Sequence, residues 1–437
     1  MSPVLDIEQI LSLIVIWWYY FYKCGGDMII RSITTFMNGS RIDGLPFEQV
    51  KILTNLVRLA RKRYEETGYE VQTSRLATNS FSEFLPLSEP LHSVKKVQDI
   101  EDMVLSEGYD YLSLGPAIPE NPESYTLIPE IFRTTETVFL TGKMINQRNE
   151  ISLAAVRACA KIITEISTYN PNGFQNLYFS ALANVPAGTP FFPSAYWEGE
   201  GTGFALALEA ADLAVEAFSN AETLREARKL YIERLESEAG KLESIGESLS
   251  KEYGVPFLGL DLTPAPFISV ERSVGTALEK LGVRSVGLHG SLAAAAFLMD
   301  AIDRARYKKI GFNGLMLPIL EDAVLAKRVE EGTLTIKDLL LMSSVCGTGL
   351  DTVPLSGDVS KEQVASVLLD VASLSSRLQK PLTARLMPIP GKRAGEKTTF
   401  DFPFFVNSCV MAIDSEPVQG LFDSEETFAI QPRMKGK

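Results

Sequence analysis

A cysteine, two glycines and two carboxylates lie close together in one stretch of the sequence. Gly347 and Gly349 follow Cys346, and Asp351 and Asp358 come soon after. Glycines permit a sharp turn that holds the thiol at a loop tip, and a thiolate in a suitable environment acts as a nucleophile. The alternative is that Cys346 is a small buried apolar residue, the usual fate of a free cysteine.

Three further polar residues are candidates for a site. Asp261 lies among apolar neighbours, so it is either paired or functional. His289 precedes an alanine-rich helix expected over 292–305, whose positive end favours the neutral imidazole, and Ser291 is a candidate N-cap of that helix. A hydrogen-bonded structural histidine is the alternative for His289.

A basic cluster follows the strand expected over 383–389. The cluster lies within 390–397 and contains Lys392 and Arg393. Together with Arg385 of the strand, these side chains are candidates to bind a carboxylate or phosphate. A solvated hairpin turn is the alternative. Asn313, in a strand expected over 311–318, is a further polar group for a substrate.

The glycine-rich segment 197–203 precedes a helix expected over 204–218. Such a loop can hold phosphate at a helix N-terminus, but Glu198 and Glu200 would repel an anion. The spacing also differs from a nucleotide fingerprint. We therefore expect no bound nucleotide there; the glycines let the loop bend, or the two carboxylates hold an amine or a metal.

Composition limits the function classes. The 437 residues are 46% hydrophobic and 22% charged, as in a globular protein with a large core. The net charge of −13, with no long basic run, disfavours nucleic acid and acidic membranes as partners. Four cysteines without a CxxC pair and two histidines argue against a zinc site or disulfides and favour the cytoplasm. No cofactor is indicated.

Strands and helices alternate along the chain. A strand over 29–36, a helix over 46–67 and a strand over 69–75 imply a parallel crossover. Further strands are expected over 109–114, 138–140, 174–182, 257–270 and 400–406. Further helices are expected over 94–107, 150–168, 221–253 and 360–378, and Cys159 is expected to be a core residue of the second of these. The residues from 414 onward are expected to form a loose tail.

The N-terminal stretch 10–22 is apolar and aromatic. Its length is below the ~20 residues that cross a bilayer. We hypothesise that residues 1–27 are upstream sequence translated from a start codon assigned too early, because 25–27 can be encoded by a run resembling a prokaryotic ribosome-binding site. A peptide covering Trp17, detected in the source cell by mass spectrometry, would contradict this hypothesis.

Five ordered blocks resemble an uncharacterised family, domain of unknown function seven-eleven. They are 183–193 (ANVPAGTPFFP), 257–267 (FLGLDLTPAPF), 287–296 (GLHGSLAAAA), 344–358 (SVCGTGLDTVPLSGD) and 380–391 (KPLTARLMPIPG). The family resembles pyruvate formate-lyase and the large subunit of ribonucleotide reductase in architecture. The resemblance implies a ten-stranded α/β barrel with a finger loop through its middle, where Cys346 matches the position of the cysteine that becomes a thiyl radical. The sequence shows no counterpart of the glycyl-radical loop.

The expected protein is one α/β barrel domain over 28–437, with a helical excursion near 204–253. The expected function is an enzyme that uses Cys346 on a small polar or anionic metabolite inside the barrel, thiolate chemistry ranking before radical chemistry. The expected proton-handling groups are Asp351 and His289, with Asp261 as a second carboxylate. The expected substrate contacts are Arg385, Lys392, Asn313 and Ser291. The alternative is a non-catalytic small-molecule-binding or regulatory protein. The partner considered besides a small-molecule ligand is a second copy of the chain, in a homo-oligomer.

Overall fold

A mixed sheet is the centre of the computed structural model, which describes residues 28–40, 44–345 and 347–432. Nine strands are hydrogen-bonded in the order β8-β7-β1-β2-β3-β4-β6-β10-β9. They are β1 (Ile29–Met37), β2 (Glu70–Thr78), β3 (Tyr111–Ala117), β4 (Val138–Lys143), β6 (Phe179–Ala183), β7 (Gly203–Glu209), β8 (Phe257–Asp261), β9 (Gly349–Ser356) and β10 (Leu382–Ile389). A separate pair joins β5 (Ile151–Ser152) to β11 (Thr427–Phe428). Cys346, Cys24 and the proposed upstream segment 1–27 lie outside the described residues.

Strand direction brings distant parts of the chain to one edge of the sheet. The strands β1, β2, β3, β4 and β6 are parallel, and β7 and β10 run antiparallel to their neighbours β1 and β6. The outer strands β8 and β9 are parallel to β7 and β10. The carboxyl ends of β7, β8, β9 and β10 therefore lie at the same edge of the sheet as the amino ends of the other five strands. The expected parallel crossover from β1 to β2 is confirmed.

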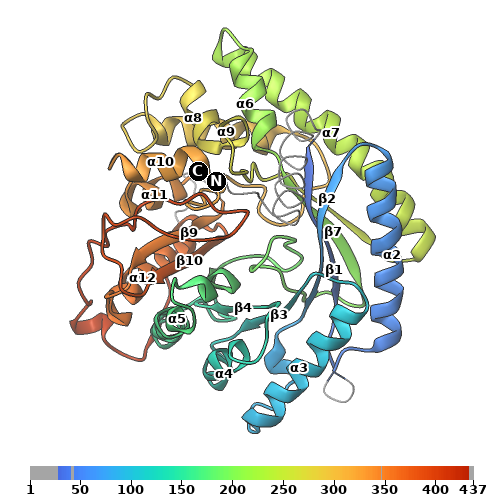
Figure 1. Cartoon of the computed structure of the whole chain (residues 1–437), viewed down its shortest axis with the longest axis vertical. Helices are drawn as coiled ribbons and strands as arrows, with labels where there is room; N and C mark the ends of the chain where they lie inside the picture. Colours follow the sequence, from blue (N-terminus) through green and yellow to red (C-terminus); the bar gives the residue numbers. More distant parts are fainter. Residues whose placement is uncertain (1–27, 41–43, 346, 433–437) are drawn as a thin grey trace, which may run out of the picture.

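Helices lie on the outer side of the sheet, with loops on the inner side (Figure 1). The helices are α2 (Phe47–Glu66), α3 (Pro90–Ser106), α4 (Glu123–Phe132), α5 (Leu153–Ile166), α6 (Ala211–Ser219), α7 (Leu224–Tyr253), α8 (Val274–Lys280), α9 (Ser291–Arg304), α10 (Ala323–Glu330), α11 (Ile336–Ser343) and α12 (Lys361–Leu378). Their apolar faces form the main core with the sheet, and Cys159 of α5 is fully buried there, as expected. Among the described helices, none has the length and apolarity to cross a bilayer.

The segment 184–202 lies across the inner face of the sheet. Thr34 of β1 donates a hydrogen bond to the carbonyl of Pro190 (2.8 Å), and Ser113 of β3 donates one to the carbonyl of Ala195 (2.7 Å). A second apolar cluster forms between this segment and the strands, in which aromatic rings pack against small side chains. The inner side is therefore filled by chain rather than by helices.

The two outer strands both approach the segment 309–318. Lys309 forms an isolated bridge with Leu260 of β8, and Pro318 forms one with Asp351 of β9. The intervening residues are irregular, so the strand expected over 311–318 is not formed. The structure shows a mixed nine-stranded sheet with helices, and it does not show the expected closed ten-stranded barrel.

Several expected elements were wrong. Residues 203–209 form β7 rather than the start of a helix, because a short apolar run fits a buried strand as well as a helix. Residues 400–406 are irregular, since Pro403 interrupts them, and their rings cluster with Phe174. The tail after 414 is held in place, because β11 pairs with β5 and Arg157 donates to the carbonyl of Ser424.

Candidate functional site

Charged side chains from strands far apart in the sheet meet near its inner face. Arg31 pairs with Glu209 (Nε to Oε1, 3.2 Å) and with Glu321 (Nη1 to Oε2, 2.9 Å). Arg385 pairs with the other oxygen of Glu321 (Nη2 to Oε1, 2.8 Å) and with Asp351 (Nε to Oδ1, 2.5 Å). We call these five residues together with Arg75 the charge network. It joins β7, β1 and β2 to β10 and β9.

Two β-bulges position this network. Arg31 is the extra residue of β1 opposite β7, where the register shifts between Ile30 and Ser32. On β9, Asp351 and Thr352 together oppose Arg385. Thr352 is buried with φ of 40°, which is rare for a β-branched residue. Bulges redirect side chains, and here they occur where the charged residues leave the regular pleat.

The electrostatics differ among the three carboxyl groups. Burial raises the pKa of Asp351 although Arg385 opposes the shift, and burial likewise raises the pKa of Glu209. Burial also disfavours the charged form of Glu321, but Arg31 and Arg385 outweigh it and lower the pKa of this carboxyl. The buried Oε2 of Glu209 accepts no hydrogen bond within the described part of the chain.

Arg75 of β2 is the member of the network without a carboxylate at ion-pair distance among the residues that the structure describes. Its Nε donates to Oγ1 of Thr73 (2.9 Å), and its guanidinium lies 5.7 Å from the ring centre of Tyr111 and 5.1 Å from that of Phe192. Burial, and then the nearby charge of Arg31, lower the pKa of Arg75 to about 10. Sequence reasoning missed this residue.

Asp261 is buried at the end of β8 and holds a turn in place. It accepts hydrogen bonds from the hydroxyl of Thr263 (2.6 Å) and from the backbone N–H groups of Phe312 (2.7 Å) and Asn313 (2.9 Å). Asn313, at φ of 41°, accepts from the N–H of Leu262 (3.1 Å). Both residues are therefore hydrogen-bonded within the fold. Of the two alternatives for Asp261, paired or functional, these contacts match the paired one.

The residues after Cys346 pack against this turn. A Cβ on Gly314 would lie 2.8 Å from Cα of Gly347, so the two glycine backbones are in contact. The hydroxyl of Thr348 donates to the carbonyl of Leu315 (2.5 Å). The backbone that follows Cys346 is thus held by these contacts. Cys346 itself lies outside the described residues, so the expectation that its thiol is enclosed stays a prediction.

The pKa of Asp261 predicts a pH effect on stability. Burial raises this pKa to about 6, against ~3.9 in an unfolded chain. The folded state therefore binds the proton more tightly, so this stabilisation is complete below about pH 4 and is lost as the pH rises through about 6. The difference in unfolding free energy between wild type and Asp261→Asn should fall by about 2 kcal/mol between pH 4 and pH 7. A constant difference would contradict the shift.

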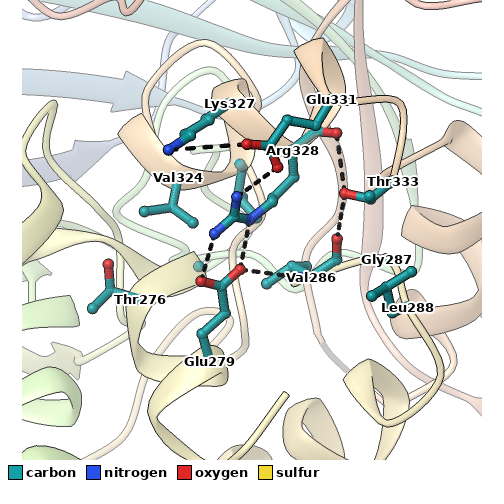
Figure 2. Close-up of polar contacts among 12 residues, drawn as sticks. Thr276, Glu279, Val286, Gly287, Leu288, Val324, Lys327, Arg328, Glu331 and Thr333 are labelled. Carbon is teal, nitrogen blue, oxygen red and sulfur yellow. Dashed lines mark hydrogen bonds and ion pairs between the residues drawn. The ribbon is translucent and has the colours of Figure 1, made fainter. Parts of the chain in front are cut away.

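The turn 286–288, which directly precedes His289, is held by Glu279 of α8, and Arg328 of α10 contacts Glu279 in turn (Figure 2). Glu279 accepts from the N–H of Val286 (3.0 Å) and from Nε of Arg328 (2.7 Å), and Thr333 donates to the carbonyl of Val286 (3.2 Å). Ser291 closes the turn by donating to the carbonyl of Leu288 (2.7 Å). These hydrogen bonds explain the conformation of the turn by contacts within the fold.

His289 and Ser291 are not in the charge network. His289 is exposed and lines a surface hollow of about 540 Å³ together with Arg284 and Phe297. Ser291 is the first residue of α9, and Gly290 occupies the N-cap position without a side-chain cap, so the expected N-cap was wrong. The structure therefore does not bring His289 together with Asp351.

The expected basic cluster is divided. Arg385 is buried in the charge network, whereas Arg393 is exposed and Lys392 partly buried in the turn after β10. The carbonyl of Lys392 accepts from the N–H of Gly357 (2.9 Å). The three residues do not form one basic patch.

Two other expectations are changed by the structure. The segment 197–203 leads into β7, so it has no helix N-terminus that would bind phosphate. Glu198 was expected to repel an anion, but Lys143 lies 2.7 Å from it and balances its charge. Over the described ranges, no group of three or more His, Cys, Asp or Glu side chains is placed to hold a metal.

Comparison with known proteins gives consistent matches. The pattern of the family described as Uncharacterised ACR (DUF711) matches residues 26–407. A UPF0210 protein of Pyrobaculum aerophilum is 31% identical over 349 residues, which are 75% of this chain and 76% of the relative. A UPF0210 protein of Methanocaldococcus jannaschii is 27% identical over 373 residues, which are 78% of this chain and 80% of the relative.

Proposed function

This chain belongs to the DUF711 family, and we propose that it is an enzyme that uses Cys346 on a small anionic metabolite at the inner face of the sheet. The observation that carries the proposal is the path of the chain around Cys346. Gly347 packs against the turn that Asp261 holds, and the chain then enters β9, where Asp351 joins the charge network. The sequence joins Cys346 directly to this stretch, so its thiol, the carboxylate of Asp351 and the guanidinium of Arg385 are the groups that we propose for one site.

The roles follow from charge and burial. Asp351 is the candidate acceptor for the thiol proton, because burial raises its pKa and so makes the carboxylate a better base. Arg385 holds Asp351 in position, and Glu321 fixes Arg385 from the other side. His289 is left out of this proposal because it is exposed beside a surface hollow.

The proposal includes the barrel that the family resemblance implies. The two isolated bridges of the segment 309–318, one to each outer strand of the sheet, support closure by a tenth strand. Closure would put Cys346 and the charge network on the inside of one barrel. The finger would then be the loop between α11 and β9.

Alkylation of the full-length protein with iodoacetamide tests the cysteine. We expect Cys346 to react at pH 7, well below the ~8.5 pKa of a free thiol, because a neighbouring base favours the thiolate. The described cysteines are internal comparators. Burial raises the pKa of Cys159 far above its usual range, and Cys409 is partly buried.

Variants make the result decisive. Peptide mapping should show label at position 346 in wild type and in Cys409→Ser, and none there in Cys346→Ser. A reaction of Cys346 no faster than that of Cys409 would contradict thiolate chemistry. If ligand binding also persisted in Cys346→Ser, the result would favour a binding or regulatory protein without chemistry.

A further inference from the structure

We infer that Arg75 is the subsite for a carboxylate group of a small ligand at the inner face of the sheet. The inference rests on the part of the proposed function that places a ligand there, and it is independent of the chemistry of Cys346. The residue that sequence reasoning had chosen for this role, Arg385, already has two carboxylate partners. Arg75 has none at ion-pair distance among the described residues.

The hydrogen-bonding capacity of Arg75 is largely unused. A guanidinium has five N–H donors in a planar fork. Nε of Arg75 donates to Thr73, and neither Nη1 nor Nη2 has a hydrogen-bond acceptor within the described part of the chain. Arg75 is partly exposed as a residue, and neither Nη atom is among the fully buried polar atoms without a partner in the described part of the chain, so both keep some contact with solvent. A carboxylate matches two parallel donors of such a fork.

The surroundings hold the guanidinium in place before any ligand binds. The rings of Tyr111 and Phe192 lie within cation–π distance of it, and Thr73, which fixes Nε, itself donates to the carbonyl of Arg31 (2.7 Å). Ordering a free arginine would reduce affinity, because immobilising a side chain with many rotamers has an entropic cost. The contacts with Tyr111, Phe192 and Thr73 reduce that cost.

Charge balance favours a carboxylate over a phosphate. The network has three arginines (31, 75 and 385) and three carboxyl groups (Glu209, Glu321 and Asp351), so it is neutral when all six are charged. All three carboxyl groups lie at ion-pair distance from Arg31 or Arg385, so Arg75 is the cation of the network without a direct carboxylate partner among the described residues. A singly charged carboxylate would match its one positive charge. A phosphate carries about −1.5 to −2 and would leave an excess of negative charge.

Ligand-dependent melting of the full-length protein tests the subsite. Acetate, pyruvate and inorganic phosphate are compared with chloride at constant ionic strength, for wild type, Arg75→Gln and Arg393→Gln. Arg393 is exposed on the turn after β10, so it is a matched loss of one arginine outside the network. We expect a carboxylate to stabilise wild type and Arg393→Gln, and its apparent Kd to rise about tenfold or more in Arg75→Gln.

Three outcomes would overturn the inference. They are stabilisation that is equal in wild type and Arg75→Gln, stabilisation by phosphate alone, and no stabilisation by any anion. Without ligand, Arg75→Gln should melt at or above the temperature of wild type, because an arginine without a carboxylate partner is removed. If Arg75→Gln does not fold, Arg75→Lys replaces it, since a lysine keeps the charge but loses the fork. Binding that persists in Cys346→Ser but fails in Arg75→Gln would separate this subsite from the cysteine chemistry.

Discussion

Replacing Glu321 with glutamine is expected to lower the free energy of unfolding by about 3–5 kcal/mol, because buried charges lose their partner. Glu321 is 5% exposed and accepts from Arg31 at 2.9 Å and Arg385 at 2.8 Å. The glutamine amide keeps the size of the side chain but turns one acceptor into a donor that faces a guanidinium. Urea unfolding followed by circular dichroism measures the effect.

Glu247→Gln is the matched control. Glu247 pairs with Lys308 at 2.7 Å, a distance similar to those of Glu321, but both side chains are about half exposed, at 45% and 46%. An exposed ion pair contributes about 0–1 kcal/mol, so this variant should unfold almost as wild type does. Equal losses in the two variants would show that the network of Glu321 does not stabilise the fold through burial.

Gly311→Ala should destabilise the protein by about 2–4 kcal/mol, through overpacking added to backbone strain. Gly311 has φ of +79°, and an added Cβ would lie 2.4 Å from Oδ2 of Asp261 and 2.9 Å from Cδ of Pro190. The carboxylate would have to move away from the N–H groups that it holds, so the turn beside Gly347 would shift as well. Differential scanning calorimetry gives the loss in stability.

The control separates backbone strain from the contact with Asp261. Gly391 has a similar φ of +74°, and an added Cβ there would meet nothing within 4 Å. Gly391→Ala should therefore lose only about 1 kcal/mol from the positive φ. A loss as large as that of Gly311→Ala would mean that strain alone explains both variants.

Much of the fold was predictable because the signals were local. The strand, helix and strand at the start of the chain were placed within a few residues, and the helix expected over 360–378 forms as α12, with Ser360 as its N-cap. Where a local pattern fits two structures, prediction failed. The apolar residues of β7 suit either element. The glycines after Cys346 indicated a loop, which the structure confirms only as far as Thr348, because Gly349 begins β9.

The site was predictable only in part. Asp351 and Arg385 were both chosen as site residues, but as a proton carrier and a ligand clamp rather than as partners of each other. Arg31 and Glu209 were missed, because a single charge within a strand shows nothing of a partner 178 residues away. Such contacts depend on how the strands pair in the folded sheet. A local pattern of residues carries no information about that pairing.

The position of Glu321 between two arginines has a consequence for synthesis on the ribosome. Arg31 of β1 emerges 290 residues before Glu321, the second of its two carboxylate partners, and Arg385 emerges later still. At about 5–20 residues per second, the nascent chain carries Arg31 without Glu321 for on the order of 15–60 s. The N-terminal strands therefore cannot reach their final electrostatic environment during most of translation, and a chain that terminates before residue 321 never does.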